Sequence, residues 1–225
     1  MNRYATFGAA RNWHKLSIYM LHVALGFRMH SGWGAVVAVD ECYSVLERQR
    51  IRVVDDDNPG GRQPYHHARD LGTEKAERFL SEYAARCKGS AEAELAQITS
   101  TLKSRGYQVT AGGLVLASAR VLPSLPVILS AHPLIHTAEG QLFRDVIRRT
   151  CEAADIPVLG TSEKQLVAAL EECFGKDAGK VKQAIEKTGK SLGPPWNSDH
   201  KQAAMAGCLA LQQFAKHVHA RRSGV

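Results

Sequence analysis

The chain has 225 residues, 44% of them hydrophobic and 23% charged, so a folded globular domain is expected and a disordered chain is excluded. The formal net charge of +7 favours an anionic partner such as nucleic acid or a phosphorylated ligand, although a charge of this size does not identify one. Five widely spaced cysteines without a CxxC pair argue against a disulfide framework or a cysteine zinc site, and no apolar run approaches the roughly 20 residues that cross a bilayer. We therefore expect a cytoplasmic protein with no membrane partner.

The N-terminal stretch is basic. No acidic residue precedes Asp40, whereas Arg3, Arg11, Lys15 and Arg28 do. We predict a flexible basic leader over residues 1–20. Its composition resembles that of a transit peptide, which leaves an organelle signal as an alternative, but it lacks the apolar core and cleavage site of a secretory signal.

Three short apolar segments then follow one another. Leu21–Arg28, Trp33–Val39 and Tyr43–Val54 are each predicted to be strands. Their short connections predict an antiparallel meander. Asp55–Gly61 is predicted to be a solvated loop, because its three consecutive acids do not alternate as the ligands of a metal-binding loop do.

The remainder of the chain alternates helical and strand patterns. Thr73–Ser104 is predicted to be helical with a break at Gly89–Ser90. Tyr107–Ala117 is predicted to be a fourth strand, in which Gly112–Gly113 marks a bulge or a close backbone approach. The later predicted elements are a helix over Pro133–Ala154, a short strand over Ile156–Gly160, a helix to Cys173 opened by a capping box of Ser162 and Gln165, a helix over Ala178–Thr188 and a last helix over Asp199–His217.

This order of elements predicts an α/β fold. Strand–helix–strand units need right-handed crossovers and therefore parallel pairing. Two parallel strands thus join the three antiparallel strands in one mixed five-stranded sheet with helices on both faces. We expect the domain to span residues 21–218 and a basic tail to cover residues 219–225.

Three stretches resemble the ribonuclease H-like superfamily, and within it the RuvC-type Holliday-junction resolvases. Leu25–Gly34 (LGFRMHSGWG) resembles that family's first strand and turn. Glu139–Ala153 with Ile156–Val158 resembles a helix and the strand after it, and Pro194–Ala206 resembles the final helix. The resemblance covers about Leu21 to Leu211 and implies the same mixed sheet.

In that family two divalent cations assist cleavage of a phosphodiester, and they need about three or four converging carboxylates. At the matching positions this chain has Arg28 in place of the first-strand aspartate and Gln202 in place of the second acid of the last helix, whereas Asp199 matches the first. No Asp or Glu occurs between Gly106 and Ala138, where a further acid is expected. The resemblance therefore implies a nucleic-acid-binding fold whose two-metal nuclease site is lost or altered, and whether any divalent cation binds stays open.

Two histidines and a carboxylate share one face of the predicted long helix. His132, His136 and Glu139 are separated by four and three residues, which places them on the same side. They are candidates for a catalytic acid–base pair or a transition-metal site, with Asp199 as a further catalytic candidate. A capping and hydrogen-bonding arrangement is the alternative, since Pro133 suits a first helical turn.

Arg28, Lys201 and Trp33 are candidates for binding nucleic acid or another anion. Arginine and lysine attract phosphate, and a tryptophan ring can stack on a base. Arg28 lies in an apolar strand and needs partners, which Glu139 and Asp199 could supply, so a structural ion pair is the alternative. Asp199 is equally suited to cap the last helix, and Trp33 to pack in the core.

Three functions are compatible with these residues. The first is a nucleic-acid-binding ribonuclease H-like protein with degenerate acidic positions. The second is an enzyme acting on a small anionic substrate through His132, His136, Glu139 and Asp199. The third is a non-catalytic homodimeric module in which the polar residues form a buried ion-pair network. Whether Arg28 and Asp199 touch or face an open cleft distinguishes these functions.

Overall fold

The computed structural model describes residues 20–55, 57–117 and 121–222, with side chains up to residue 216. The expected basic leader lies outside the described residues apart from Met20. The end of the expected basic tail, residues 223–225, lies outside them as well.

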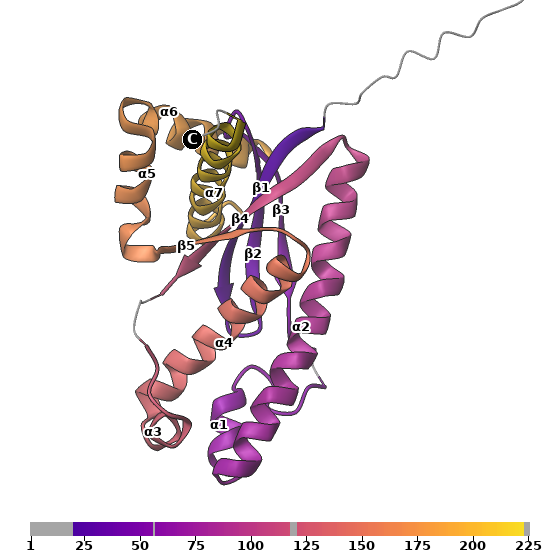
Figure 1. The fold of residues 1–225 in the computed structure, drawn as a ribbon, viewed down its shortest axis with the longest axis vertical. Coiled ribbons are helices and arrows are strands. Elements are labelled where there is room, and N and C mark those ends of the chain that lie inside the picture. Colours follow the sequence, from indigo (N-terminus) through magenta and orange to yellow (C-terminus); the bar gives the residue numbers. More distant parts are fainter. Residues whose placement is uncertain (1–19, 56, 118–120, 223–225) are drawn as a thin grey trace, which may run out of the picture.

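A mixed five-stranded sheet with the strand order β3-β2-β1-β4-β5 forms the centre of the fold (Figure 1). The strands are β1 Leu21–His30, β2 Trp33–Asp40, β3 Val45–Arg52, β4 Tyr107–Leu116 and β5 Val158–Ser162. The β1–β2 and β2–β3 pairs are antiparallel, whereas the β1–β4 and β4–β5 pairs are parallel. The α/β fold class expected from the sequence is confirmed, and the sheet has the ribonuclease H-like layout.

Helices cover both faces of the sheet. α2 and α4 pack on one face, and α7 packs on the other with α5 and α6 against it. The short helices α1 and α3 lie beside α2 and α4 at one end of the molecule (Figure 1). The helices are α1 Pro64–Arg69, α2 Thr73–Ser104, α3 Leu125–Ser130, α4 His132–Ala153, α5 Leu166–Phe174, α6 Ala178–Ser191 and α7 Ser198–Arg222, with 3-10 turns at Glu163–Gln165 and Gly175–Asp177. Along the described ranges, no helix is both long and apolar enough to cross a membrane.

Side chains alternate between the two faces along β1. Phe27 is fully buried on the α2–α4 side, in one core with Phe143. Ala24 is buried on the opposite side, in a second core with Ala203 of α7. Arg28 and His30 follow Ala24 at even spacing and therefore share the face of α7. The polar end of β1 thus projects towards the start of α7.

α7 lies directly against β1 and β4 because both strands carry a glycine beneath it. A Cβ atom on Gly26 would stand 1.7 Å from the carbonyl oxygen of Ala203, and one on Gly113 would stand 2.0 Å from that of Ala206. No side chain fits in that space, so the close backbone approach expected at Gly112–Gly113 is confirmed. The irregular step of the β1–β4 register lies nearer the start of both strands.

Some helix boundaries differ from the expectation. α2 runs unbroken through Gly89–Ser90, because its buried apolar stripe continues across this pair. The capping box of Ser162 and Gln165 does not form, since a 3-10 turn follows β5 directly and Ser162 makes no side-chain cap hydrogen bond. α7 continues to Arg222, past the expected end at His217. α1 and α3 were not predicted, because six residues are too few to show a helical period.

Replacing Gly113 by alanine tests the contact between α7 and the sheet. We expect the variant to lose about 1–3 kcal/mol of unfolding free energy, because α7 must shift to admit a methyl group. Gly89→Ala is the matched control, since a Cβ there meets nothing within 4 Å, and it should gain up to about 1 kcal/mol. Urea denaturation followed by circular dichroism measures both, and wild-type stability of the Gly113→Ala variant would contradict the contact.

Candidate functional site

Five polar side chains meet where β1 and β5 end and α7 begins. They form the arginine cluster, which consists of Arg28, His30, Glu163, Asp199 and Gln202. Arg28 and His30 lie at the end of β1, Glu163 directly follows β5, and the other two lie at the start of α7. Parallel strands end at the same edge of a sheet, so β1 and β5 bring their last side chains to one place.

Arg28 lies at the centre of this cluster. Its Nη2 is 2.9 Å from Glu163 Oε2, its Nε donates to Gln202 Oε1 at 2.8 Å, and Nε is 4.0 Å from Asp199 Oδ1. Gln202 Nε2 donates to Glu163 Oε1 at 3.1 Å, and His30 Nε2 lies 3.0 Å from Asp199 Oδ2. Only 15% of the Arg28 side chain is exposed, so its charge depends on these partners.

Arg28 and Asp199 thus belong to one ion-pair network and do not face each other across a cleft. Glu163 is the closest acidic partner of Arg28, which corrects the expectation that Glu139 would supply this charge. The Asp199 carboxylate turns to His30 and does not cap α7. Burial lowers the pKa of the neighbouring Arg144 guanidinium, and the charge of Arg28 lowers it further.

The capping contact of α7 comes from another residue. Asn197 Oδ1 accepts a hydrogen bond from the backbone N–H of His200 at 3.3 Å. This bond satisfies one of the free N–H groups in the first turn. Asp199 is therefore available for the arginine cluster.

The arginine cluster does not fit the two divalent cations that the family resemblance implies. Such a pair needs about three or four converging carboxylates. Among the described residues the cluster contains two, Glu163 and Asp199, and the Arg28 guanidinium lies between 2.9 and 4.0 Å from both. A cation placed beside them would be repelled by this fixed positive charge. The guanidinium therefore occupies the place where the carboxylates could hold a metal ion.

A row of polar and aromatic side chains continues from the cluster across β2 and β3. This basic strip consists of His30, Trp33, Arg50 and Arg52. The register pairs Trp33 with both His30 and Arg52, so the three share one face of the sheet. Trp33 stacks on His30 with 4.5 Å between ring centroids, and the Arg50 guanidinium carbon lies 4.1 Å from the centre of the Trp33 ring. Arg50 and Arg52 are exposed, and their donors face solvent.

Lys201 lies outside both the cluster and the strip. Its Nζ is 3.1 Å from Glu186 Oε2, and Trp196 Nε1 donates to the same carboxylate oxygen at 3.2 Å. Lys201 precedes Gln202 by one residue and is therefore rotated by about 100° around α7, towards α6. Hydrogen bonds from Lys190, Lys201 and Trp196 lower the pKa of Glu186 to about 2. Lys201 thus belongs to the α6–α7 contact.

A second group of polar side chains joins α1 to the start of α4. This histidine cluster consists of His66, His132, His136 and Glu139. Each histidine offers one nitrogen, and these three nitrogens lie within 4.8 Å of one another. His66 Nε2 is 3.4 Å from His132 Nε2, and His66 Nδ1 is 2.9 Å from Glu139 Oε1. The structure therefore brings together the three residues expected on one helix face and adds His66 from α1.

The position of His66 depends on how α1 is held. Pro64 lies in the first turn of α1, and Tyr65 packs against apolar residues of α3 and α4. Ala68 is fully buried in a small core with Leu80 of α2. These contacts fix the helix and direct His66 at the α4 surface.

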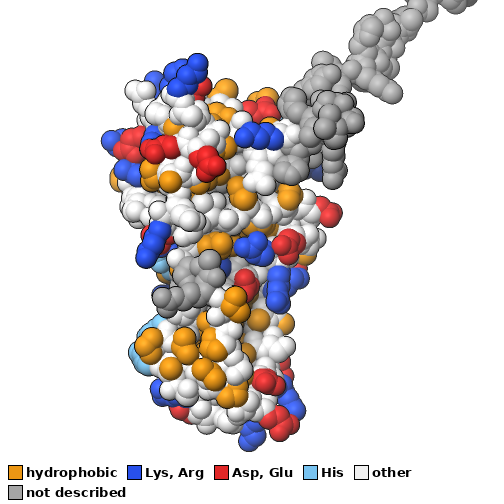
Figure 2. Space-filling view, turned by 60° about the vertical axis from the view of Figure 1, so that its left-hand side comes forward, with side chains coloured by type: hydrophobic (Ala, Val, Ile, Leu, Met, Phe, Trp, Pro, Cys, Tyr) orange, Lys and Arg blue, Asp and Glu red, His pale blue; other side chains and the backbone are white. Residues whose placement is uncertain are grey.

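Solvent can reach the histidine cluster. His136 and Glu139 line an open pocket of about 720 Å³, together with residues of the β1–β2 turn and of the loop before α1. The lining residues from these two segments are Ser31, Gly60, Gly61, Arg62 and Gln63. Figure 2 shows histidine side chains at the surface, beside hydrophobic side chains that gather over the end of the molecule where α3 lies.

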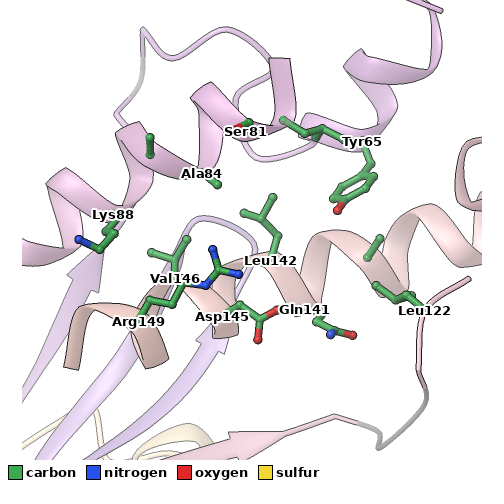
Figure 3. Close-up of a pocket in the computed structure, with 13 residues that line it drawn as sticks. Tyr65, Ser81, Ala84, Lys88, Leu122, Gln141, Leu142, Asp145, Val146 and Arg149 are labelled. Carbon is green, nitrogen blue, oxygen red and sulfur yellow. The ribbon is translucent and has the colours of Figure 1, made fainter. Parts of the chain in front are cut away.

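A groove of about 490 Å³ runs between α2 and α4 (Figure 3). Leu142 and Val146 form its apolar wall, and Asp145 and Arg149 project along the same side of α4. Tyr65 closes one end, where burial raises the pKa of its phenol and Asp145 adds to the shift. The groove is lined by both apolar and charged side chains. No residue of the arginine cluster or of the histidine cluster lines it.

The sequence interpretation missed His30, His66 and Glu163 as site residues, and it placed Arg50 and Arg52 in a predicted strand without assigning them a role. Glu163 carried a usable signal, because an acid directly after a parallel strand lies at the edge where such strands converge. His66 follows a segment rich in turn residues, and His30 lies at the end of a strand. At neither position does a helical or strand period of the sequence indicate a partner. Their contacts depend on tertiary packing. Asp199 and Glu139, which were grouped as one catalytic set, fall in different clusters.

No protein-family model and no curated protein matches the chain. It is similar to two solved structures of Thermus thermophilus RuvC. One, in complex with a Holliday junction substrate, has 8% sequence identity and a TM-score of 0.47, with 87% of this chain and 96% of that chain covered. The other has 9% identity and a TM-score of 0.43, with 90% and 96% covered. At these values the similarity concerns the fold and carries no argument about activity.

A double-mutant cycle on Arg28→Met and Glu163→Gln tests the arginine cluster. We expect a coupling free energy of about 1–2 kcal/mol, because each single change leaves a half-buried charge without its partner. The Lys180–Asp177 ion pair is the control, since its side chains are 81% and 50% exposed and their coupling should be negligible beside that of the cluster. Chemical denaturation gives both values. Additive effects of the two substitutions in the cluster would contradict the network.

Proposed function

We propose that this ribonuclease H-like protein binds nucleic acid at the end of its sheet, without a two-metal nuclease centre. The observation that supports this function most is the basic strip. Arg50 and Arg52 are exposed, the Arg50 guanidinium lies over the Trp33 ring, and Arg52 pairs with Trp33 in the strand register. Charged donors beside an aromatic ring suit a chain of phosphates and bases.

Each part of the strip has a separate contribution. Arg50 and Arg52 make no ion pair with another described residue, so their charge is available to phosphate oxygens. Guanidinium groups bind phosphate with two parallel hydrogen bonds. Trp33 contributes by holding the Arg50 guanidinium over its ring, and a base could stack on it only by displacing Arg50 or His30. Because phosphate contacts release counterions, binding of this kind weakens steeply with salt.

Arg28 has a positioning role in this proposal. Its guanidinium is mostly buried and engaged with Glu163 and Gln202, so it is not free to meet a phosphate. It instead anchors the start of α7 against β1, and Asp199 holds His30, on which Trp33 stacks. The carboxylates needed for a metal pair are used in this network, which is why we propose that cleavage is lost.

Salt-titrated binding tests the proposal. Labelled branched, duplex and single-stranded DNA and RNA are titrated with the full chain, and fluorescence anisotropy gives the slope of log Kobs against log salt. We expect the Arg50→Ala/Arg52→Ala double variant to bind more weakly and to flatten the slope by about 2, or about 1 for each phosphate contact removed. Incubation of the branched DNA with Mg²⁺ should leave it intact.

Lys176→Ala/Lys180→Ala is the matched control. It removes the same formal charge at the α5–α6 end of the molecule, where both lysines are exposed. An equal effect of the two double variants would show that binding depends on net charge alone and not on the basic strip. Absence of binding at low salt would contradict nucleic-acid recognition, and Mg²⁺-dependent cleavage would contradict the loss of the nuclease centre.

A homodimer is a second candidate, and the hydrophobic surface near α3 favours it. Val127 is 47% exposed and Val121 95% exposed in this region, where Figure 2 shows hydrophobic side chains gathered. Apolar patches of this kind commonly mark protein contacts. A second copy of the chain is expected to cover the patch. Light scattering should then find a dimer that Val127→Asp converts to a monomer, and a wild-type monomer at all concentrations would exclude it.

A further inference from the structure

We propose that the histidine cluster is a binding site for one transition-metal ion, with Zn²⁺ as the best fit. His66, His132 and His136 are the ligands, and Glu139 orients His66 from behind. This site is independent of the nucleic-acid surface, since it is built from α1 and α4 and shares no residue with the arginine cluster or the basic strip.

The spacing of the nitrogen atoms fits a common ion. Zn–N bonds measure about 2.0–2.1 Å, so two imidazole nitrogens on one tetrahedral ion stand about 3.3 Å apart. The Nε2 atoms of His66 and His132 are 3.4 Å apart, and the third nitrogen lies within 4.8 Å of both. A small rotation of the His136 ring, whose side chain is 52% exposed, closes the remaining distance. Three rings thus converge on one point from two helices.

Glu139 fixes the form in which His66 is held. Its Oε1 accepts hydrogen bonds from the backbone N–H of His66 at 3.3 Å and from Nδ1 at 2.9 Å. With the proton on Nδ1, the lone pair of Nε2 points to His132. A carboxylate that holds the second nitrogen of a ligand histidine is a recurring part of zinc sites, where it sets the tautomer and the ring orientation.

The buried position of the Glu139 carboxylate also favours a cation close to it. The residue is 2% exposed, and within the described residues its ion-pair partners are two histidines, with no lysine or arginine among them. An ionised carboxylate at this depth is costly unless positive charge lies close by. A divalent ion bound to the three imidazoles supplies positive charge close to this carboxylate.

The ligand chemistry selects the kind of ion. Imidazole nitrogen suits Zn²⁺ and its transition-metal neighbours, whereas Mg²⁺ and Ca²⁺ prefer oxygen ligands. Three protein ligands leave one coordination position, and sites with this arrangement keep a solvent molecule there. The adjoining pocket of about 720 Å³, lined by His136 and Glu139, gives solvent and small ligands access to that side of the cluster.

Direct metal binding tests the site. The full chain is prepared without a polyhistidine tag, stripped with chelator and titrated with Zn²⁺ or Co²⁺, and bound metal is counted by mass spectrometry. We expect one ion per chain and a Co²⁺ visible spectrum of a nitrogen-ligated tetrahedral or five-coordinate site. Mg²⁺ should neither bind nor compete. His132→Ala and His136→Ala should each lose the ion, and Glu139→Gln should weaken Zn²⁺ affinity about 10- to 100-fold.

His67→Ala is the matched control. His67 is the next residue of α1, is exposed, and packs at a tilted angle against Phe79 of α2. Because the His132 and His136 side chains are exposed, their removal should leave the circular dichroism spectrum and the unfolding midpoint of the metal-free protein unchanged. Equal metal content in wild type and in folded His132→Ala, or equal loss in His67→Ala, would overturn the site. Neither result depends on whether the protein binds nucleic acid.

Discussion

The contact between α7 and the central strands decides where the polar residues of this protein meet. Gly26 and Gly113 let the backbone of α7 rest on the sheet at a distance that no side chain would permit. Gln202 of α7 is thereby placed within hydrogen-bonding distance of Arg28. If α7 stood away from the sheet by the thickness of one methyl group, Gln202 would lose its bond to Arg28, and the guanidinium would lie half-buried with fewer partners. The glycines therefore determine the geometry of a polar network to which they contribute no polar side chain.

That network contains its own fixed cation. Where two carboxylates approach each other at the end of a sheet, their repulsion must be offset by a bound ion or by a basic side chain. Here Arg28 offsets the charges of Glu163 and Asp199, and its five N–H donors also determine the direction of each contact. Because this cation is a side chain of the protein, it cannot be exchanged for an ion from solvent. The histidine cluster on α1 and α4 differs, since among the described residues its buried carboxylate, Glu139, pairs with histidines and with no arginine or lysine.

The sequence alone predicts the sheet and shows that acidic residues expected from the resemblance are missing. It does not predict every residue of the arginine cluster and of the histidine cluster. Short apolar runs predict β1 and β2, because strands covered by helices on both faces are apolar throughout. Alternation predicts β3, and the Gly112–Gly113 pair marks the place where α7 packs on the sheet. Arg28, at the position where the resemblance implies an aspartate, is the residue from which the altered metal site is predicted. The sequence could not show that Lys201 turns to Glu186, because a rotation of one residue around α7 changes its neighbour entirely. It also could not bring His66 to α4, since the position of α1 depends on apolar contacts of Tyr65 and Ala68 with distant helices.

The position of β3 in the sheet gives Arg50 and Arg52 a second effect, on contacts between copies of the protein. In the described part of the chain β3 forms one edge of the sheet, with its outer row of backbone N–H and C=O groups unpaired by another strand. Such edges can add strands from neighbouring molecules and so promote aggregation, and charged side chains on the edge oppose this pairing. Arg50 and Arg52 are charged side chains of this kind. On the proposed function the same two side chains would bind polyanions and oppose pairing at this edge, so an excess of polyanion that neutralises them should also favour self-association through it.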